Sequence, residues 1–157
     1  MASKVPKKYT SGLGDSTSAK RKAEIRKRTK GKKSFEPLPG DAKAKTRKSQ
    51  YTKKVERKGT RKTILEEATK GKGSPQDRFI RAVSTVTEIP RGIIDEVYKK
   101  GLAAWAGGHR PGATQAQWAR ARVYSFISKG KTIESADKML YEKALKALKK
   151  KGKRFSF

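Results

Sequence analysis

Apolar side chains are sparse in the first half of this chain and recur at helical spacing in the second half. Through Gly73 the few large apolar residues are scattered too thinly to build a core. From Ser74 onward they recur every three or four positions, which is typical of helices that bury one face. The pattern therefore predicts an all-α protein with an arm over residues 1–73, a helical domain over 74–148 and a tail over 149–157.

Boundary signals divide the predicted domain into about four helices. Ser74, Pro75 and Asp77 form a helix start, with an N-cap hydroxyl, a proline in the first turn and an acid near the positive helix end. The first helix is expected to run to about Thr87. Pro90 then opens a second helix that carries further apolar residues at helical spacing.

Two more helices are expected after these. Thr114 with Gln117 resembles a capping box for a third helix, which Gly130 ends. Ser135 can cap a fourth. The apolar stripe of this fourth helix, with lysines opposite, consists of Ala136, Met139, Leu140, Ala144, Ala147 and Leu148.

The arm is expected to be long and mostly extended, with short helices. Ser18 could cap a basic helix that runs toward Lys30, and a second weak helix covers Arg61 to Thr69. Between them, the prolines of residues 35–40 exclude helix, because proline fixes φ and pushes the preceding residue toward extended geometry. We expect the arm to have little contact with the helical domain and to become ordered against partner molecules.

The net charge of the chain changes this picture, because a chain this basic needs a negatively charged partner to complete its structure. Of 157 residues, 33% are hydrophobic and 36% are charged, and the formal net charge is +28. The arm carries 24 basic and 7 acidic side chains, and the rest of the chain 18 and 7. Self-repulsion opposes collapse at such a charge. Nucleic acid, an anionic membrane and acidic protein surfaces are the candidate partners, and duplex phosphate is the densest, with roughly one charge per 1.7 Å.

The sequence lacks cysteine and long apolar segments, which excludes several classes of protein. No cysteine is present, which excludes disulfides and thiolate metal sites. No apolar run approaches the roughly 20 residues of a membrane span, and the N-terminus lacks the apolar core of a secretory signal. We therefore expect a chain without a transmembrane segment that works inside a cell or inside a particle.

Runs of basic residues are the strongest functional signal. They recur across the arm and reappear in the tail, which favours binding to polyanions or partner proteins over a role in solubility alone. Such runs also serve as nuclear localisation signals, and the sequence does not separate the two interpretations. The candidate binding residues are Lys7, Lys8, Lys20, Arg21, Lys22, Arg26, Lys27, Arg28, Lys32, Lys33, Lys53, Lys54, Lys149, Lys150 and Lys151.

No catalytic arrangement of residues stands out. Lys131 and Thr132 after Gly130 look like the end of a phosphate-binding P-loop, but Ser125 stands where that motif needs glycine. His109 is the only histidine, so no histidine pair can hold a metal, and no nucleophile has the spacing of a triad around it. We expect no enzyme, metal, cofactor or small-molecule substrate.

The segment His109, Arg110, Pro111 and Gly112 is expected to be a rigid structural turn. Its imidazole and guanidinium would bond helix-end carbonyls or a carboxylate.

Trp105 and Trp118 flank this turn. Paired aromatics beside arginines can stack nucleobases. Both tryptophans, however, fall on predicted helices whose apolar faces need a large cover, so we expect them to be structural.

Four short blocks along the chain carry a resemblance. They are residues 101–105 (GLAAW), 108–114 (GHRPGAT), 117–119 (QWA) and 121–127 (ARVYSFI). In these blocks the chain resembles an uncharacterised domain family of large algal DNA viruses and some tailed phages. The opening PKKYTSGL also looks like the start of short basic proteins from such viruses. The resemblance implies a viral origin and brings no assigned chemistry with it.

A small, basic viral protein with a long arm is expected to be a virion component, such as a minor capsid protein beneath or within the shell. Its partners would be other capsid or assembly proteins and the packaged DNA or RNA. The alternative is a genome-condensing or ribosomal-type protein that makes non-specific phosphate contacts. The arm is richer in lysine than in arginine, which favours non-specific charge neutralisation.

Overall fold

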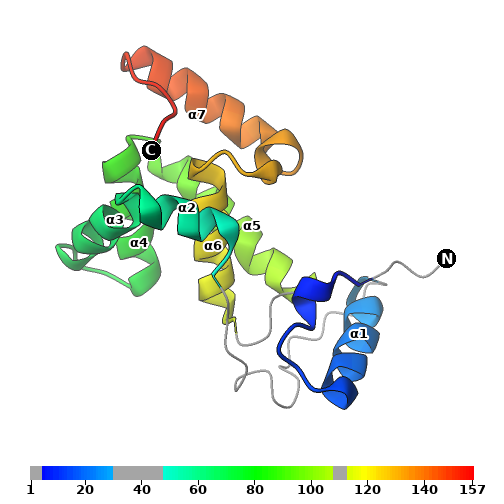
Figure 1. The fold of residues 1–157 in the computed structure, drawn as a ribbon. Coiled ribbons are helices and arrows are strands. Elements are labelled where there is room, and N and C mark those ends of the chain that lie inside the picture. The colour runs from blue at the N-terminus through cyan, green and yellow to red at the C-terminus, as the bar shows by residue number, and fades with distance from the viewer. Residues whose placement is uncertain (1–4, 30–47, 108–112) are drawn as a thin grey trace. The chain divides into compact units, whose positions relative to one another are not determined.

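The computed structural model of the chain describes residues 5–29, 48–107 and 113–157. These residues form helices and connecting turns, with no strand among them, so the expected all-α class is confirmed. Two are short 3₁₀ helices and the others are α-helices (Figure 1). In chain order they are η1 (Lys7–Tyr9), α1 (Asp15–Thr29), α2 (Gln50–Arg57), α3 (Thr60–Thr69), α4 (Pro75–Thr87), α5 (Arg91–Gly107), α6 (Gln115–Ile127), η2 (Lys131–Glu134) and α7 (Lys138–Lys150).

The chain divides into two compact units. The first unit combines Met1–Arg47 with Leu102–Trp118, and the second combines Lys48–Gly101 with Ala119–Phe157. The expected boundary at Gly73 therefore differs from the division in the structure. The reason is that segments distant in sequence pack together, which a reading of local composition does not reveal.

The first unit contains η1, α1 and the adjoining ends of α5 and α6. Its α1 begins at Asp15, earlier than the expected cap at Ser18, and places that acid in the first turn, where the helix dipole favours it. Tyr9 packs near Trp118, with ring centroids 6.1 Å apart. The indole of Trp105 is buried and donates its Nε1–H to the carbonyl of Ala113 at 2.9 Å.

The second unit has a core built mainly by α4, α5 and α6. Its fully buried side chains include Phe79, Ile80, Val83, Ile94, Val97, Val123 and Phe126. Helices α5 and α6 approach each other closely at Gly101, where a Cβ atom would lie only 2.6 Å from the Cα of Ala119. Glycine is therefore required at this crossing.

Helices α2 and α3 belong to the second unit, which corrects the expectation of an extended arm through Gly73. Val55 of α2 and Ile64 of α3 are 1% and 0% exposed. The Lys54 ammonium donates to the carbonyl of Ser128, just after the end of α6, at 3.1 Å. One buried apolar residue in each short helix is sufficient here, because the larger core already exists for it to pack against.

Several expected helix ends agree with the structure. Ser74 accepts a hydrogen bond from the backbone N–H of Asp77 at 3.1 Å, and α4 covers the expected residues. Thr114 and Gln117 form both bonds of a capping box, at 3.1 and 3.0 Å. The weak helix expected over Arg61 to Thr69 is α3.

The start of α7 differs from the expectation of a Ser135 cap. Asp137 occupies the N-cap position without a side-chain cap bond, because its carboxylate is engaged by Arg122 at 2.9 Å. Leu140, Ala144 and Leu148 are buried as expected, but Met139 is 72% exposed and lies outside the apolar stripe. Met139 lies about 100° around the helix from Leu140, on the side away from Ala144 and Leu148. Ala136, which was also expected in the stripe, precedes the helix and is exposed.

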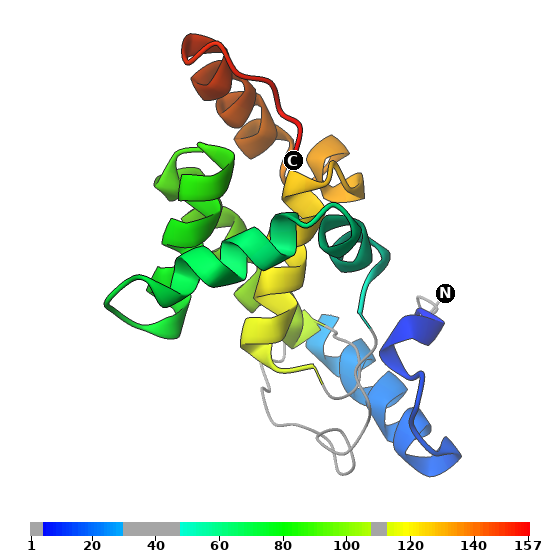
Figure 2. The same ribbon diagram turned by 60° about the vertical axis from the view of Figure 1, so that its left-hand side comes forward.

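The segment after α7 turns back (Figure 2) and packs against other residues of the second unit, to which it belongs. Phe155 is 4% exposed, and its ring centroid lies 4.9 Å from that of Tyr141 and 5.7 Å from that of Phe126. An aromatic anchor therefore holds the basic end of the chain.

Candidate functional site

The second unit is basic in its own right. Its residues include 26 lysines and arginines against 10 aspartates and glutamates, a net charge of +16. Helix α7 contributes five lysines and one glutamate to this charge; the lysines are Lys138, Lys143, Lys146, Lys149 and Lys150.

These five residues lie on one side of the helix, here called the α7 lysine face. At 3.6 residues per turn they project opposite the buried stripe of Leu140, Ala144 and Leu148. All five are exposed, and none of them forms an ion pair with another described residue. The same side also carries one exposed acid, Glu142, one helical turn from Lys138 and from Lys146. Five lysines against this one acid leave an excess of positive charge facing solvent.

Two basic residues beyond α7 are engaged by the fold. Lys151 donates to the backbone carbonyl of Glu88 at 3.0 Å, and Lys153 forms an ion pair with the Glu88 carboxylate. Glu88 terminates α4 with a left-handed backbone, φ 60°. Of the run at 149–151, Lys149 and Lys150 face solvent freely, whereas Lys151 ties the C-terminal segment to the end of α4.

The basic residues of the first unit are divided as well. Lys7, Lys8, Lys20 and Lys22 are exposed. Arg21 is 0% exposed, which corrects its expected role as a partner-binding residue. It lies one helical turn from the buried Ile25, so the two share the inward face of α1. Arg26, the residue after Ile25, is exposed.

Two binding candidates on α2 have different surroundings. Lys53 is exposed, whereas Lys54 is the donor that joins α2 to Ser128. The side chains of Lys27 and Arg28, and all of Lys32 and Lys33, lie outside the described residues.

The expected turn at His109, Arg110, Pro111 and Gly112 also lies outside the described residues. Of the two tryptophans beside it, Trp105 is buried and Trp118 is half-buried against Tyr9. Trp105 has the placement of a core side chain.

An arginine–aromatic cluster in the second unit was not anticipated from the sequence. Phe79 packs edge-on against Tyr124 at 5.7 Å and near Tyr98 at 6.1 Å. The Arg120 guanidinium lies over the Phe79 ring at 5.2 Å, and that of Arg61 over the Tyr124 ring at 5.9 Å. Phe79 and Arg120 are 41 positions apart in sequence, so no local pattern signals the cluster.

The cluster perturbs its tyrosines. Burial raises the pKa of Tyr98, and the Arg120 guanidinium opposes this shift. Burial likewise raises the pKa of Tyr124, opposed by Arg61 and Arg120. Both hydroxyls are therefore held in the neutral form to unusually high pH.

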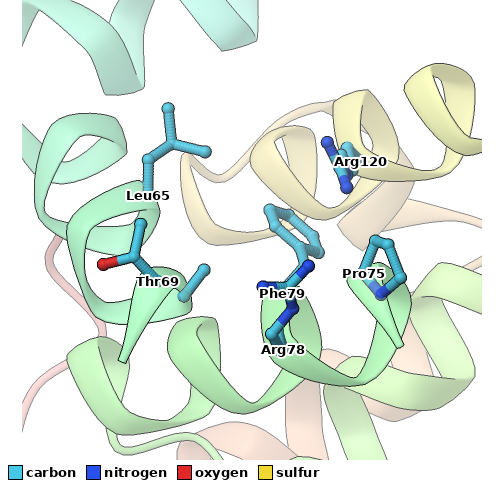
Figure 3. Close-up of a pocket in the computed structure, with 7 residues that line it drawn as sticks. Leu65, Thr69, Pro75, Arg78, Phe79 and Arg120 are labelled. Carbon is cyan, nitrogen blue, oxygen red and sulfur yellow. The ribbon is translucent and has the colours of Figure 1, made fainter. Parts of the chain in front are cut away.

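A depression of about 160 Å³ opens beside this cluster, between α3, α4 and α6. Its lining residues are Leu65, Ala68, Thr69, Pro75, Arg78, Phe79 and Arg120. Figure 3 shows Arg78 and Phe79 reaching it from α4 and Arg120 from α6. It combines an apolar wall with two cationic groups.

The described residues meet the requirements of neither a metal site nor a membrane span. Within residues 5–29, 48–107 and 113–157, no three His, Cys, Asp or Glu side chains gather in a way that could hold a metal ion. None of the described helices is both long and apolar enough to cross a membrane.

Comparison with known proteins gives one match. The model of a family of unknown function (DUF5824) matches residues 6–146. No curated protein and no solved structure matches the chain. Since the matched region includes both compact units almost in full, the chain belongs to this family of unknown function.

Proposed function

We propose that the chain is a non-catalytic architectural protein that binds polyanions through exposed, unpaired lysines. The observation that carries the proposal is the α7 lysine face, five exposed lysines on one side of one helix that share it with a single acid, Glu142, and form no ion pair with a described residue. Lysine ammonium groups act as mobile point charges, which suits contact with phosphate of any sequence.

The surrounding assembly is proposed to be a virion. The resemblance of residues 101–127 to a domain of large algal DNA viruses and tailed phages supports this setting. A net charge of +28 on 157 residues suits a protein placed between acidic capsid surfaces and a packaged genome. In that setting the genome is the densest polyanion, so we take nucleic-acid phosphate as the primary contact of the α7 lysine face.

The proposal is tested by removing charge from two matched sets of lysines. One variant replaces Lys143, Lys146 and Lys150 with glutamine. The control replaces Lys62, Lys70 and Lys99, which are also exposed but pair with Glu66, Glu67 and Asp95. Both variants lose three positive charges.

Binding is measured by fluorescence anisotropy on a random-sequence DNA duplex over a salt series. Each phosphate contact contributes about 0.9 to the slope of log affinity against log salt. We expect the slope of the α7 variant to fall by the equivalent of about two to three phosphate contacts. The slope of the control should fall by the equivalent of less than about one contact. Equal losses would show that only net charge matters and would contradict a binding face on α7.

A further inference from the structure

The depression between α3, α4 and α6 contains two arginines without an acidic partner. The Nε atoms of Arg78 and Arg120 are buried and have no hydrogen-bond partner among the described residues. Neither guanidinium forms an ion pair within that part of the chain. Each buried Nε–H has lost its water, and an acceptor supplied by a ligand would offset that cost.

Nearby acids do not neutralise the depression, since they are occupied elsewhere. On α3, Glu66 pairs with Lys62 and Glu67 pairs with Lys70 at 2.9 Å. On α4, Asp77 accepts from Ser74 and pairs with Arg91 at 3.4 Å. The two arginines therefore set a positive potential at the depression.

The remaining wall of the depression is apolar. Leu65 is 39% exposed, and Ala68 and Pro75 extend the same wall. A simple inorganic anion would leave this wall uncovered. The wall suits a ligand that carries an apolar or ring-shaped group next to its negative charge.

We propose that this depression binds the phosphate of a nucleotide. The phosphate oxygens lie between the guanidinium groups of Arg78 and Arg120, whose planar forks match phosphate geometry. Phe79 holds Arg120 by a cation–π contact, so that group is already ordered before a ligand binds. The adjoining sugar or base covers Leu65 and Pro75.

The nucleotide can be free or can belong to a nucleic-acid strand. Only the second case rests on the proposed function, since a free nucleotide would bind regardless of the α7 lysine face. The residues of the depression are also different from those of that face, so the two sites can be altered separately.

The first test observes the unmodified full-length chain by NMR. The Nε–Hε signals of Arg78 and Arg120 are followed while adenosine monophosphate, inorganic phosphate, a ten-nucleotide single-stranded DNA or an acetylated glutamate peptide is added. We expect saturable shifts of both signals, with adenosine monophosphate binding about tenfold more tightly than inorganic phosphate because it covers the apolar wall.

The DNA distinguishes the two sources of the phosphate. If DNA saturates the arginine signals at a much lower concentration than adenosine monophosphate does, the site is assigned to a nucleic-acid strand. If the two saturate the signals at comparable concentrations, the site is assigned to a free nucleotide. Both outcomes support the proposal. No saturable shift with any phosphate compound, or a peptide that binds as tightly as adenosine monophosphate, would overturn it.

The second test replaces Arg78 with glutamine. Arg78 has no described partner to lose, so the variant is expected to melt like the parent. Adenosine monophosphate should bind at least about tenfold more weakly, since a charge-assisted contact is removed. The control Lys72→Gln removes one positive charge from an exposed side chain that does not line the depression, and it should change affinity less than about threefold.

The outcomes also separate this site from the proposed function. If duplex DNA binds normally and Arg78→Gln leaves the affinity for adenosine monophosphate unchanged, the nucleotide site is refuted while the α7 lysine face stands. If duplex DNA does not bind but adenosine monophosphate shifts both arginine signals, the proposed function fails and the site stands.

Discussion

Arg122 donates a hydrogen bond through Nη2 to Oδ1 of Asp137 at 2.9 Å, and the Asp137 side chain is completely buried. Lys100 approaches the same oxygen at 3.8 Å and donates to the carbonyl of Ala136 at 2.6 Å. This network joins α5, α6 and the start of α7. It fixes the helix that presents the α7 lysine face.

Replacing Asp137 with asparagine should destabilise the second unit by about 3 kcal/mol, because the partly buried Arg122 loses its counter-charge. The measurement is urea unfolding followed by circular dichroism. Asp95→Asn is the control, since its pair with Lys99 lies at the surface and should contribute less than about 1 kcal/mol. A similar, small loss for both variants would show that the buried pair does not hold α7.

Replacing Ile64 with alanine tests whether α3 belongs to the folded second unit. Ile64 is 0% exposed, so truncation should cost roughly 2–4 kcal/mol of unfolding free energy. Its neighbour Leu65 is 39% exposed, and Leu65→Ala should cost less than about 1 kcal/mol. If the Ile64 variant unfolds at the parent's urea midpoint, residues 48–73 are an independent arm after all.

Signals that act over one helical turn could be predicted from the sequence, and signals that act across the fold could not. The start of α4 at Ser74 and the capping box at Thr114 depend on residues three positions apart, so the sequence displays them directly. Helix α2 was missed because Val55 is its only large buried apolar residue, and its anchor at Ser128 lies 74 positions away. The same distance problem concealed the arginines of the depression.

Runs of consecutive basic residues predict the exposed cations only in part, because a run does not show which side of a helix each member occupies. A run of lysines and arginines winds around a helix, so neighbouring members point in different directions. Arg21 therefore turns inward while Lys20 and Lys22 face solvent. On α7, Lys143, Lys146 and Lys150 are spaced three and four residues apart, so they lie on one face of the helix. A search for consecutive basic residues, such as 149–151, does not find this spacing.

Replacing Gly101 with alanine should destabilise the chain, because the new Cβ would lie 2.6 Å from the Cα of Ala119 and force α5 and α6 apart. We expect a cost of roughly 1–3 kcal/mol by thermal or urea unfolding. Gly92 lies in the same helix, and a Cβ added there would meet nothing within 4 Å, so Gly92→Ala should be neutral or stabilising. Equal behaviour of the two variants would refute close packing at Gly101.

Tyr98 and Tyr124 should be the last tyrosines to ionise in the folded chain, since burial raises the pKa of both above 10.0. The unfolded chain releases these protons first, so stability is full below about pH 10 and falls as pH rises through the folded pKa values. Phenolate absorbance against pH measures this. The double variant Tyr98→Phe with Tyr124→Phe should lose the part of the absorbance change that occurs at the highest pH. If it loses absorbance change near pH 10 instead, the buried cluster is contradicted.

The proposed function is polyanion binding by charge, without reading of the nucleotide sequence. The most direct measurement is the affinity of the full chain for two DNA duplexes of equal length and unrelated sequence, from low to physiological salt. We predict affinities within about threefold of each other and a log–log slope of roughly −0.9 for each phosphate contacted. Strong preference for one duplex, with affinity that barely responds to salt, would contradict the proposed function.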